Sequence, residues 1–189
     1  SDLCEPAEKQ ATDNIYRCYY WLAYAGMDEE DILNVKCSDV DFKTLTVKYD
    51  KKYTVVPIYP EGLEAFHNCV ELDSFAFLHP NYSHEIRKER AAGDTLIRGI
   101  RSALTIKALR VELSRRSKNK SDNTPLKLSY FRVWISGVFY RMYEQETIGV
   151  PPDFNAIVSQ QMEGKTYKLD SGRNTIEAKH RQLKRDYEE

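Results

Sequence analysis

Residues that favour β-strands are concentrated in one short stretch of this chain, and helical spacing dominates on both sides of it. Thr44–Tyr49 and Tyr53–Ile58 are rich in β-branched and aromatic residues and flank three polar residues, which predicts a β-hairpin. From Ala7 to Ala25, apolar residues recur every three or four positions, which predicts a helix that ends at Gly26. The predicted fold is therefore mainly α with a small antiparallel β-hairpin or sheet, in the α+β class.

The rest of the chain is predicted to be mostly helical, because apolar residues recur at helical spacing. The expected helices are Asp28–Val35 with Asp28 as its N-cap, a helix that starts at Pro60, Asp94–Arg116, Leu128–Tyr143, Phe154–Met162 and Arg173–Tyr187. Asp39–Asp41 is expected to be a turn, and the polar residues between the apolar run Phe75–Leu78 and Gly93 are expected to be a loop. Ser117–Pro125 has no large apolar residue and is the clearest candidate for a linker.

Length and composition favour one folded domain over residues 1–189, since 41% of the residues are hydrophobic. No stretch approaches the roughly 20 apolar residues of a membrane span, and no signal pattern opens the chain, so a soluble cytoplasmic protein is expected. The four cysteines are irregularly spaced, so we expect reduced thiols that mostly pack, and neither a metal nor a cofactor. The helical pattern begins almost at once after Ser1, and the chain is expected to be a fragment of a longer protein.

Charge is distributed unevenly along the chain, although the net charge is only -1. Residues 1–75 hold 15 Asp and Glu against 7 Lys and Arg, whereas residues 84–120 hold 11 Lys and Arg against 4 acids. The basic segment is the best candidate for contact with a polyanion. The alternative is that these charges form the solvated face of an amphipathic helix.

Several short motifs occur in an order that points to one protein family. Tyr24-Ala25-Gly26-Met27-Asp28 leads into an acidic helix, and Ser38-Asp39-Val40-Asp41 precedes the lysine-bearing hairpin and Val56-Pro57-Ile58. Late in the chain come Leu128-Ser129-Tyr130-Phe131-Arg132 and, further on, Tyr167. In this order and spacing, the chain resembles the catalytic domain of the tyrosine recombinases, the phage integrases, over nearly its whole length.

The resemblance implies a role in site-specific DNA recombination, as in DNA integration by a prophage or another mobile element. In the family, a tyrosine hydroxyl attacks a DNA phosphodiester and forms a 3'-phosphotyrosine link without a metal ion. Two arginines clamp the non-bridging phosphate oxygens, where negative charge grows in the transition state. A hairpin lysine protonates the leaving oxygen, and histidines assist proton transfer and phosphate contact.

Some positions of this chain match that catalytic set. By the resemblance, Arg132 corresponds to the second arginine and Tyr167 to the nucleophile. Lys48 and Lys51 compete for the role of the hairpin lysine, and Lys52 is less favoured by register. Each residue also has an ordinary interpretation: a buried arginine that joins two helices, a packing or surface tyrosine, and exposed hairpin lysines.

Other positions depart from the family pattern. Asp28 stands where the first arginine is expected, and its carboxylate would repel a phosphodiester. Ser129 replaces the first histidine, and Gln161 or its neighbour Gln160 lies near the later histidine position; neither side-chain type titrates near pH 7. Loss of one oxyanion donor typically costs about 100- to 1,000-fold in rate, so we expect a degenerate active site with impaired cleavage.

The sequence leaves three functional hypotheses. The first is a DNA-binding protein derived from tyrosine recombinases, with double-stranded DNA as its partner and impaired cleavage. The others are an active integrase with an unusual catalytic set and a non-DNA interaction module on the same scaffold. The expected DNA contacts are Arg87, Lys88, Arg98, Arg101, Arg115 and Arg116. The family's N-terminal core-binding domain is expected to be absent from this fragment, and the thin apolar stripe of the C-terminal helix is compatible with self-association.

Overall fold

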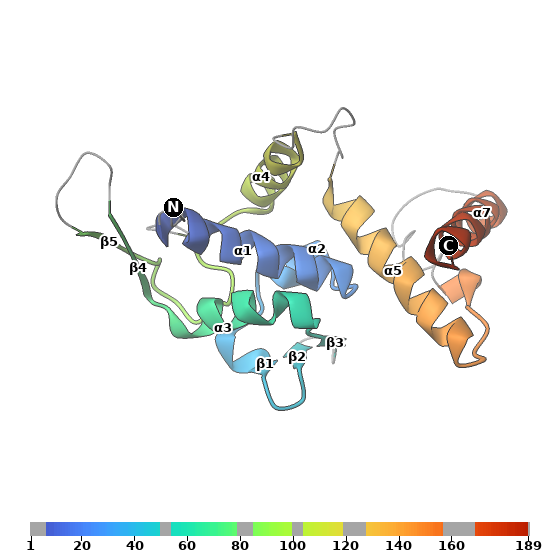
Figure 1. Ribbon diagram of the computed structural model, residues 1–189, viewed down its shortest axis with the longest axis horizontal. Helices are drawn as coiled ribbons and strands as arrows, with labels where there is room; N and C mark the ends of the chain where they lie inside the picture. The colour runs from blue at the N-terminus through green and yellow to red at the C-terminus, as the bar shows by residue number, and fades with distance from the viewer. Residues whose placement is uncertain are drawn as a thin grey trace. The chain divides into compact units, whose positions relative to one another are not determined.

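The computed structural model describes residues 7–49, 54–78, 85–99, 104–118, 128–156 and 169–188 (Figure 1). The chain divides into two compact units: an N-terminal unit, Ser1–Trp134, and a C-terminal unit, Ile135–Glu189. Helices predominate in both, and the strands form small antiparallel sheets in the N-terminal unit, as the α+β prediction requires. None of the helices in the described parts of the chain is both long and apolar enough to span a membrane.

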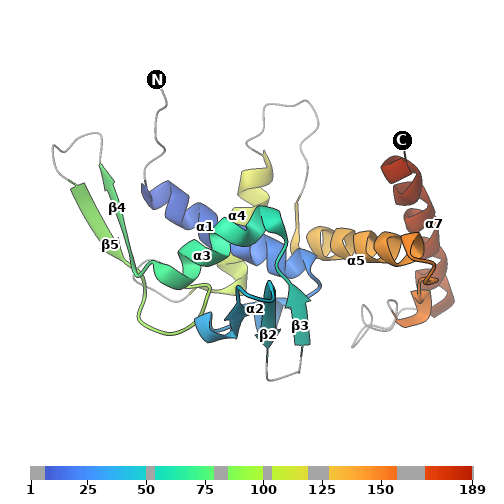
Figure 2. The ribbon, with the colours of Figure 1, turned by 60° about the horizontal axis from the view of Figure 1, so that its bottom comes forward.

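Helix α1 (Ala7–Tyr24) forms the centre of the N-terminal unit, and the prediction of a helix here is confirmed. It packs against α3 (Leu63–Glu71), and the two helices lie side by side in Figures 1 and 2. The buried face of α1 has helical spacing and consists of Ile15, Cys18, Tyr19, Leu22 and Ala23. The helix stops before Gly26, whose φ of 98° is strained for any residue with a side chain.

The predicted hairpin is confirmed and belongs to a three-stranded antiparallel sheet in the order β1-β2-β3. Its strands are β1 (Val40–Asp41), β2 (Thr46–Tyr49) and β3 (Thr54–Pro57). The prediction of a turn at Asp39–Asp41 was wrong, because Val40 and Asp41 pair with β2 after a 3₁₀ turn, η1 (Cys37–Asp39). The turn comes later: one oxygen of Asp41 accepts the backbone N–H groups of Lys43 and Thr44.

Two helix predictions were too long for one shared reason. Helix α2 covers only Glu29–Ile32, and α4 begins at Ile106 and ends at Lys118. Lys36 and Thr95 instead form an antiparallel β-bridge, in which Leu96 N–H bonds the Val35 carbonyl at 2.7 Å and Cys37 N–H bonds the Asp94 carbonyl at 2.8 Å. This contact between distant segments keeps the end of the predicted helix Asp28–Val35 and the start of the predicted helix Asp94–Arg116 out of helical geometry. Of the predicted linker, residues 117 and 118 belong to α4, and 119–125 lie outside the described residues.

A short 3₁₀ turn, η3 (Pro60–Gly62), leads into α3, which confirms the helix predicted from Pro60.

The prediction of a loop between Leu78 and Gly93 was wrong over part of its length. Strand β4 (Ser74–Leu78) then pairs antiparallel with β5 (Glu85–Glu89), with Phe75 opposite Lys88. Because β5 contains a single aliphatic residue, Ile86, its sequence lacks the apolar alternation that predicts a strand.

Helix α5 (Tyr130–Thr147) begins in the N-terminal unit and continues into the C-terminal unit, which also contains α7 (Leu169–Glu188). Both predicted helices are confirmed with shifted bounds. Phe154–Ala156 is helical, and the rest of the predicted helix up to Met162 lies outside the described residues. Helix α7 packs on α5 of the same chain, because His180 bonds Glu146 at 2.9 Å and lies 6.2 Å from the Phe139 ring. The buried Ile176 belongs to the same face of α7.

Candidate functional site

The turn after α1 is joined to the start of α5 by two hydrogen bonds. The Tyr130 hydroxyl donates to the Met27 carbonyl at 2.9 Å, and the Trp134 indole N–H donates to the Gly26 carbonyl at 3.2 Å. Both donors and both acceptors belong to the N-terminal unit. These bonds bring the two motif segments that the sequence separates by about a hundred residues into one neighbourhood. We call this neighbourhood, formed by Gly26–Glu29 and Ser129–Arg132, the turn–helix junction.

Asp28 gives the junction a negative charge. The residue occupies the N-cap position of α2, as predicted, but its side chain makes no capping hydrogen bond; instead its backbone carbonyl accepts the N–H groups of Asp31 and Ile32. Burial raises the pKa of Tyr130, and the charges of Asp28 and Glu29 raise it further, so the Asp28 carboxylate acts on the α5 side of the junction. A phosphate approaching here meets a repelling charge.

The neighbouring Glu29 is buried and holds an arginine from α4. Its carboxylate, in a residue only 6% exposed, accepts two-pronged hydrogen bonds from Arg110 and one from the Tyr19 hydroxyl. The Arg110 side chain remains 63% exposed, and its bond to Glu29 raises the pKa of the guanidinium. Arg110 thus ties α4 to α2 beside the junction. The sequence contained no local signal for this pair, which joins residues 81 positions apart.

On the α5 side, Ser129 and Arg132 have different roles. The Ser129 hydroxyl accepts the Arg132 backbone N–H at 3.3 Å and so caps the start of α5. Arg132 is exposed in the first turn of that helix, which differs from the interpretation of a buried arginine between two helices. An arginine in the first turn of a helix lies near the positive end of the helix dipole, which favours anions.

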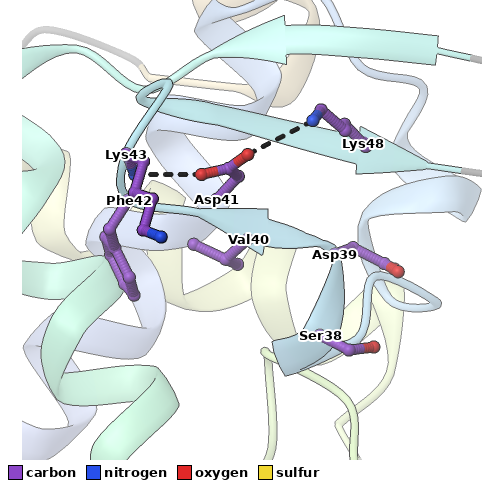
Figure 3. A pocket seen from close by; sticks show the side chains of 7 residues that line it. All are labelled: Ser38, Asp39, Val40, Asp41, Phe42, Lys43 and Lys48. Atoms are coloured by element: carbon purple, nitrogen blue, oxygen red, sulfur yellow. Dashed lines mark hydrogen bonds and ion pairs between the residues drawn. The ribbon is translucent and has the colours of Figure 1, made fainter.

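Lys48 lies at a separate hollow on the three-stranded sheet (Figure 3). The hollow has a volume of about 620 Å³ and is lined by Ser38, Asp39, Val40, Asp41, Phe42, Lys43 and Lys48. Lys48 Nζ lies 3.2 Å from one oxygen of Asp41. Hydrogen bonds from Thr44, then Lys48 and Lys43, lower the pKa of Asp41 to about 2. The other candidate for the hairpin lysine, Lys51, lies outside the described residues.

Two of the six expected DNA contacts, Arg98 and Arg115, are engaged within the chain. Arg98 is only 10% exposed at its side chain and donates to the Gly93 carbonyl and to Asp73. Arg115 is exposed but forms a two-pronged pair with Glu112, and Lys88 is half-buried. The side chains of Arg87 and Arg116 and the whole of Arg101 lie outside the described residues.

Arg90, from the same basic segment, is a structural residue. It is 6% exposed, and its guanidinium donates to the backbone carbonyls of Cys69, Leu72 and Leu96. These bonds join the end of α3 to the chain that precedes α4. An arginine used in this way is not available to an external polyanion.

The predicted nucleophile Tyr167 and the position Gln161 both lie outside the described residues, so their placement relative to the junction stays a prediction. Among the described residues, no group of His, Cys, Asp and Glu side chains is arranged to hold a metal ion. Cys18 and Cys69 are buried free thiols, in agreement with the expectation of packing residues.

Comparison of the chain with protein-family models and with curated protein sequences gives no match. The relationship to the tyrosine recombinases therefore stays a prediction, drawn from the order of the motifs.

Proposed function

We propose that the chain is a DNA-binding domain of tyrosine-recombinase type that acts in the cytoplasm, contacts the DNA backbone through Arg132, and cleaves DNA poorly. The observation that carries the proposal is the turn–helix junction. In the family, the two arginines at these motif positions clamp one phosphate, so the segments that contain them must be neighbours. In this chain, the bonds of Tyr130 and Trp134 hold those two segments together.

The same junction supports impaired cleavage. One of the two clamping positions holds Asp28, and the position of the first histidine holds Ser129, whose hydroxyl caps α5. Catalysis of phosphoryl transfer depends on positive charge and hydrogen-bond donors that are already aimed at the growing negative charge. A carboxylate at this position acts in the opposite direction, so phosphate binding by Arg132 is weakened and the transition state is not stabilised.

Replacement of Asp28 by arginine tests the proposal directly. If the junction contacts DNA, Asp28→Arg will tighten binding to a roughly 30-base-pair duplex by about fivefold or more in 50 mM salt, because repulsion becomes attraction. Glu30→Arg is the matched control, since this exposed residue of α2 undergoes the same change of charge outside the junction. Equal gains in the two variants, measured by fluorescence anisotropy, would show that only the total charge matters.

A nicked duplex that traps covalent intermediates tests the claim about cleavage. We expect no protein–DNA adduct from the natural chain on denaturing gels. An adduct that forms and is lost in Tyr167→Phe would instead identify an active integrase with an unusual catalytic set. In that case the impaired-cleavage part of the proposal is wrong, while the DNA-binding part stands.

One observation favours a second candidate function, a non-DNA interaction module. In the described part of the basic segment, Arg90, Arg98, Arg110 and Arg115 all donate to groups of the same chain, and the exposed Asp28 and Glu30 make α2 acidic. This alternative predicts no duplex binding even at low salt, for the natural chain and for Asp28→Arg alike. The anisotropy measurement therefore separates the two functions.

A further inference from the structure

Helix α7 presents two arginines on the face opposite to its buried side. Ile176 and His180 are buried against the C-terminal unit, whereas Arg181 and Arg185 are exposed. Together with Ala178, these arginines line a hollow of about 520 Å³. The short side chain of Ala178 leaves room between the longer ones. The hollow can therefore admit a group of the size of a phosphate.

The two arginines retain hydrogen-bond donors for an external partner. Arg181 donates from Nε to the Glu177 carbonyl at 3.4 Å, and in the described part of the chain neither Arg181 nor Arg185 contacts a carboxylate. Lys184 differs, because its ammonium lies 2.8 Å from Glu146. An arginine offers five N–H donors in a planar fork, so most of the donors of this pair face solvent.

The helix that bears them is fixed to its neighbour. Glu146 on α5 binds both His180 and Lys184, and its pKa is lowered first by the Lys184 bond. The His180 ring also lies 5.6 Å from that of Phe154. A helix anchored on one face holds the Cα atoms of the arginines on its other face at a constant separation, so little backbone order must be gained on binding.

We propose that Arg181 and Arg185 form a second contact surface for the phosphate backbone of duplex DNA. Four residues of α-helix span about 6 Å, so the two forks can engage neighbouring phosphates, each through paired N–H···O bonds. This inference rests on the proposed DNA-binding function. It assigns to the C-terminal unit a binding role that the sequence pattern, centred on residues 84–120, did not indicate.

The exposed face of α7 fits a nucleic acid better than a membrane. A helix that lies in a lipid surface needs large apolar side chains on the face it inserts. The exposed residues among 176–186 are instead polar or small: Ala178, Lys179, Arg181, Gln182, Arg185 and Asp186. This face offers electrostatic attraction and hydrogen bonds, without an apolar anchor.

A pair of double variants tests the surface. Arg181→Gln/Arg185→Gln will weaken binding to a roughly 30-base-pair duplex by about tenfold in 50 mM salt, and will lower the slope of log K against log salt by about 1.8. The matched control is Arg17→Gln/Lys36→Gln, which removes the same charge from two exposed, carboxylate-paired residues of the N-terminal unit. Its affinity and salt slope will match those of the natural chain. Circular dichroism confirms that each variant is folded.

Each outcome has a defined meaning. If the natural chain binds duplex DNA and Arg181→Gln/Arg185→Gln binds equally well with the same salt slope, the α7 surface is overturned and the proposed function stands. If the natural chain does not bind duplex DNA, both are overturned. Titrations with single-stranded RNA and with phosphatidylserine vesicles complete the test. A loss confined to either of these ligands overturns the assignment to duplex DNA.

Discussion

The arginines around α4 and those on α7 belong to the same residue type but are used differently. Around α4, Arg90 binds three backbone carbonyls, Arg98 binds a carbonyl and Asp73, and Arg110 binds Glu29. On α7, Arg181 contacts one carbonyl at 3.4 Å, and the described residues supply no carboxylate to it or to Arg185. The first group stabilises the fold of the N-terminal unit, while the second is available to a ligand.

The charge counted along a sequence is therefore not the charge that a surface presents. Residues 84–120 have the larger excess of Lys and Arg, yet three of their described arginines, Arg90, Arg98 and Arg110, bond groups where segments of the N-terminal unit meet. Arg181 and Arg185 lie on α7, which contains both acidic and basic residues, so its composition does not indicate a site for a polyanion. Their position opposite the buried face of α7 is what leaves them open to solvent.

Among the substitutions considered, the replacement of Arg90 should lower the free energy of unfolding most. Arg90→Met removes the donors of three carbonyls, two of them deep in the unit, and should lower the free energy of unfolding by about 3 kcal/mol. Urea denaturation followed by circular dichroism measures the change. Lys107→Met, at an exposed position of α4, is the control and should stay within about 0.5 kcal/mol. Equal stabilities would contradict a structural role for Arg90.

A somewhat smaller loss is expected at Arg110. Arg110→Gln leaves the buried Glu29 carboxylate without its cation and should cost about 2 kcal/mol, a figure discounted because the arginine itself is largely exposed. The double variant Glu29→Gln/Arg110→Gln removes the unpaired charge and should recover part of the loss. Arg115→Gln is the control in the same helix. Its pair with Glu112 joins an exposed arginine to a partly buried carboxylate one turn away in the same helix, and should contribute less than about 0.5 kcal/mol.

The Asp41–Lys48 pair is expected to make a modest, pH-dependent contribution. Hydrogen bonds that lower the pKa of Asp41 to about 2 stabilise the folded chain above the ordinary aspartate pKa, and this stabilisation is lost as the pH falls through about 2. Asp41→Asn should therefore be less stable than the natural chain at pH 7. The difference should shrink between about pH 4 and 2. A gap that stays constant over this range would argue against the charged carboxylate as its cause.

The smallest expected effect on stability is that of the α7 arginines. Arg181→Gln/Arg185→Gln should leave the free energy of unfolding within about 0.5 kcal/mol of the natural value, because neither side chain holds segments of the described structure together. The same urea titration measures it. A loss comparable with that of Arg110→Gln would remove the contrast between the two groups of arginines.

Much of the secondary structure follows from local pattern. The spacing of apolar residues located α1, α3, α5 and α7, and the β-branched residues located the β2–β3 hairpin. The failures occurred where a segment takes its conformation from the segment that it pairs with. Strand β5 depends on β4, and the first residues of the predicted helix Asp94–Arg116 bond Val35 and Cys37, about 60 positions earlier in the chain. Such pairings are made by backbone N–H and C=O groups, which nearly every residue has, so no local residue pattern predicts them.

The candidate site was likewise predicted in part. The motif residues Asp28, Ser129 and Arg132 were found from their order in the sequence, and the hydrogen bonds of Tyr130 and Trp134 then brought their segments together. The capping role of Ser129 and the burial of Glu29 under Arg110 were not predicted. Both depend on where a side chain points once the segments have packed.

The mainly helical class and the hairpin can be read from the residue pattern, because helical and strand spacing are local properties. Which arginines keep donors for a ligand depends instead on how the segments pack in three dimensions. Cys69, one partner of Arg90, lies 21 residues away in the chain, and Glu29, the partner of Arg110, lies 81 residues away, whereas a hydrogen bond depends on distance in space. Arg90 and Arg110 thus became part of the scaffold of the N-terminal unit, and Arg181 and Arg185 became exposed cations of α7.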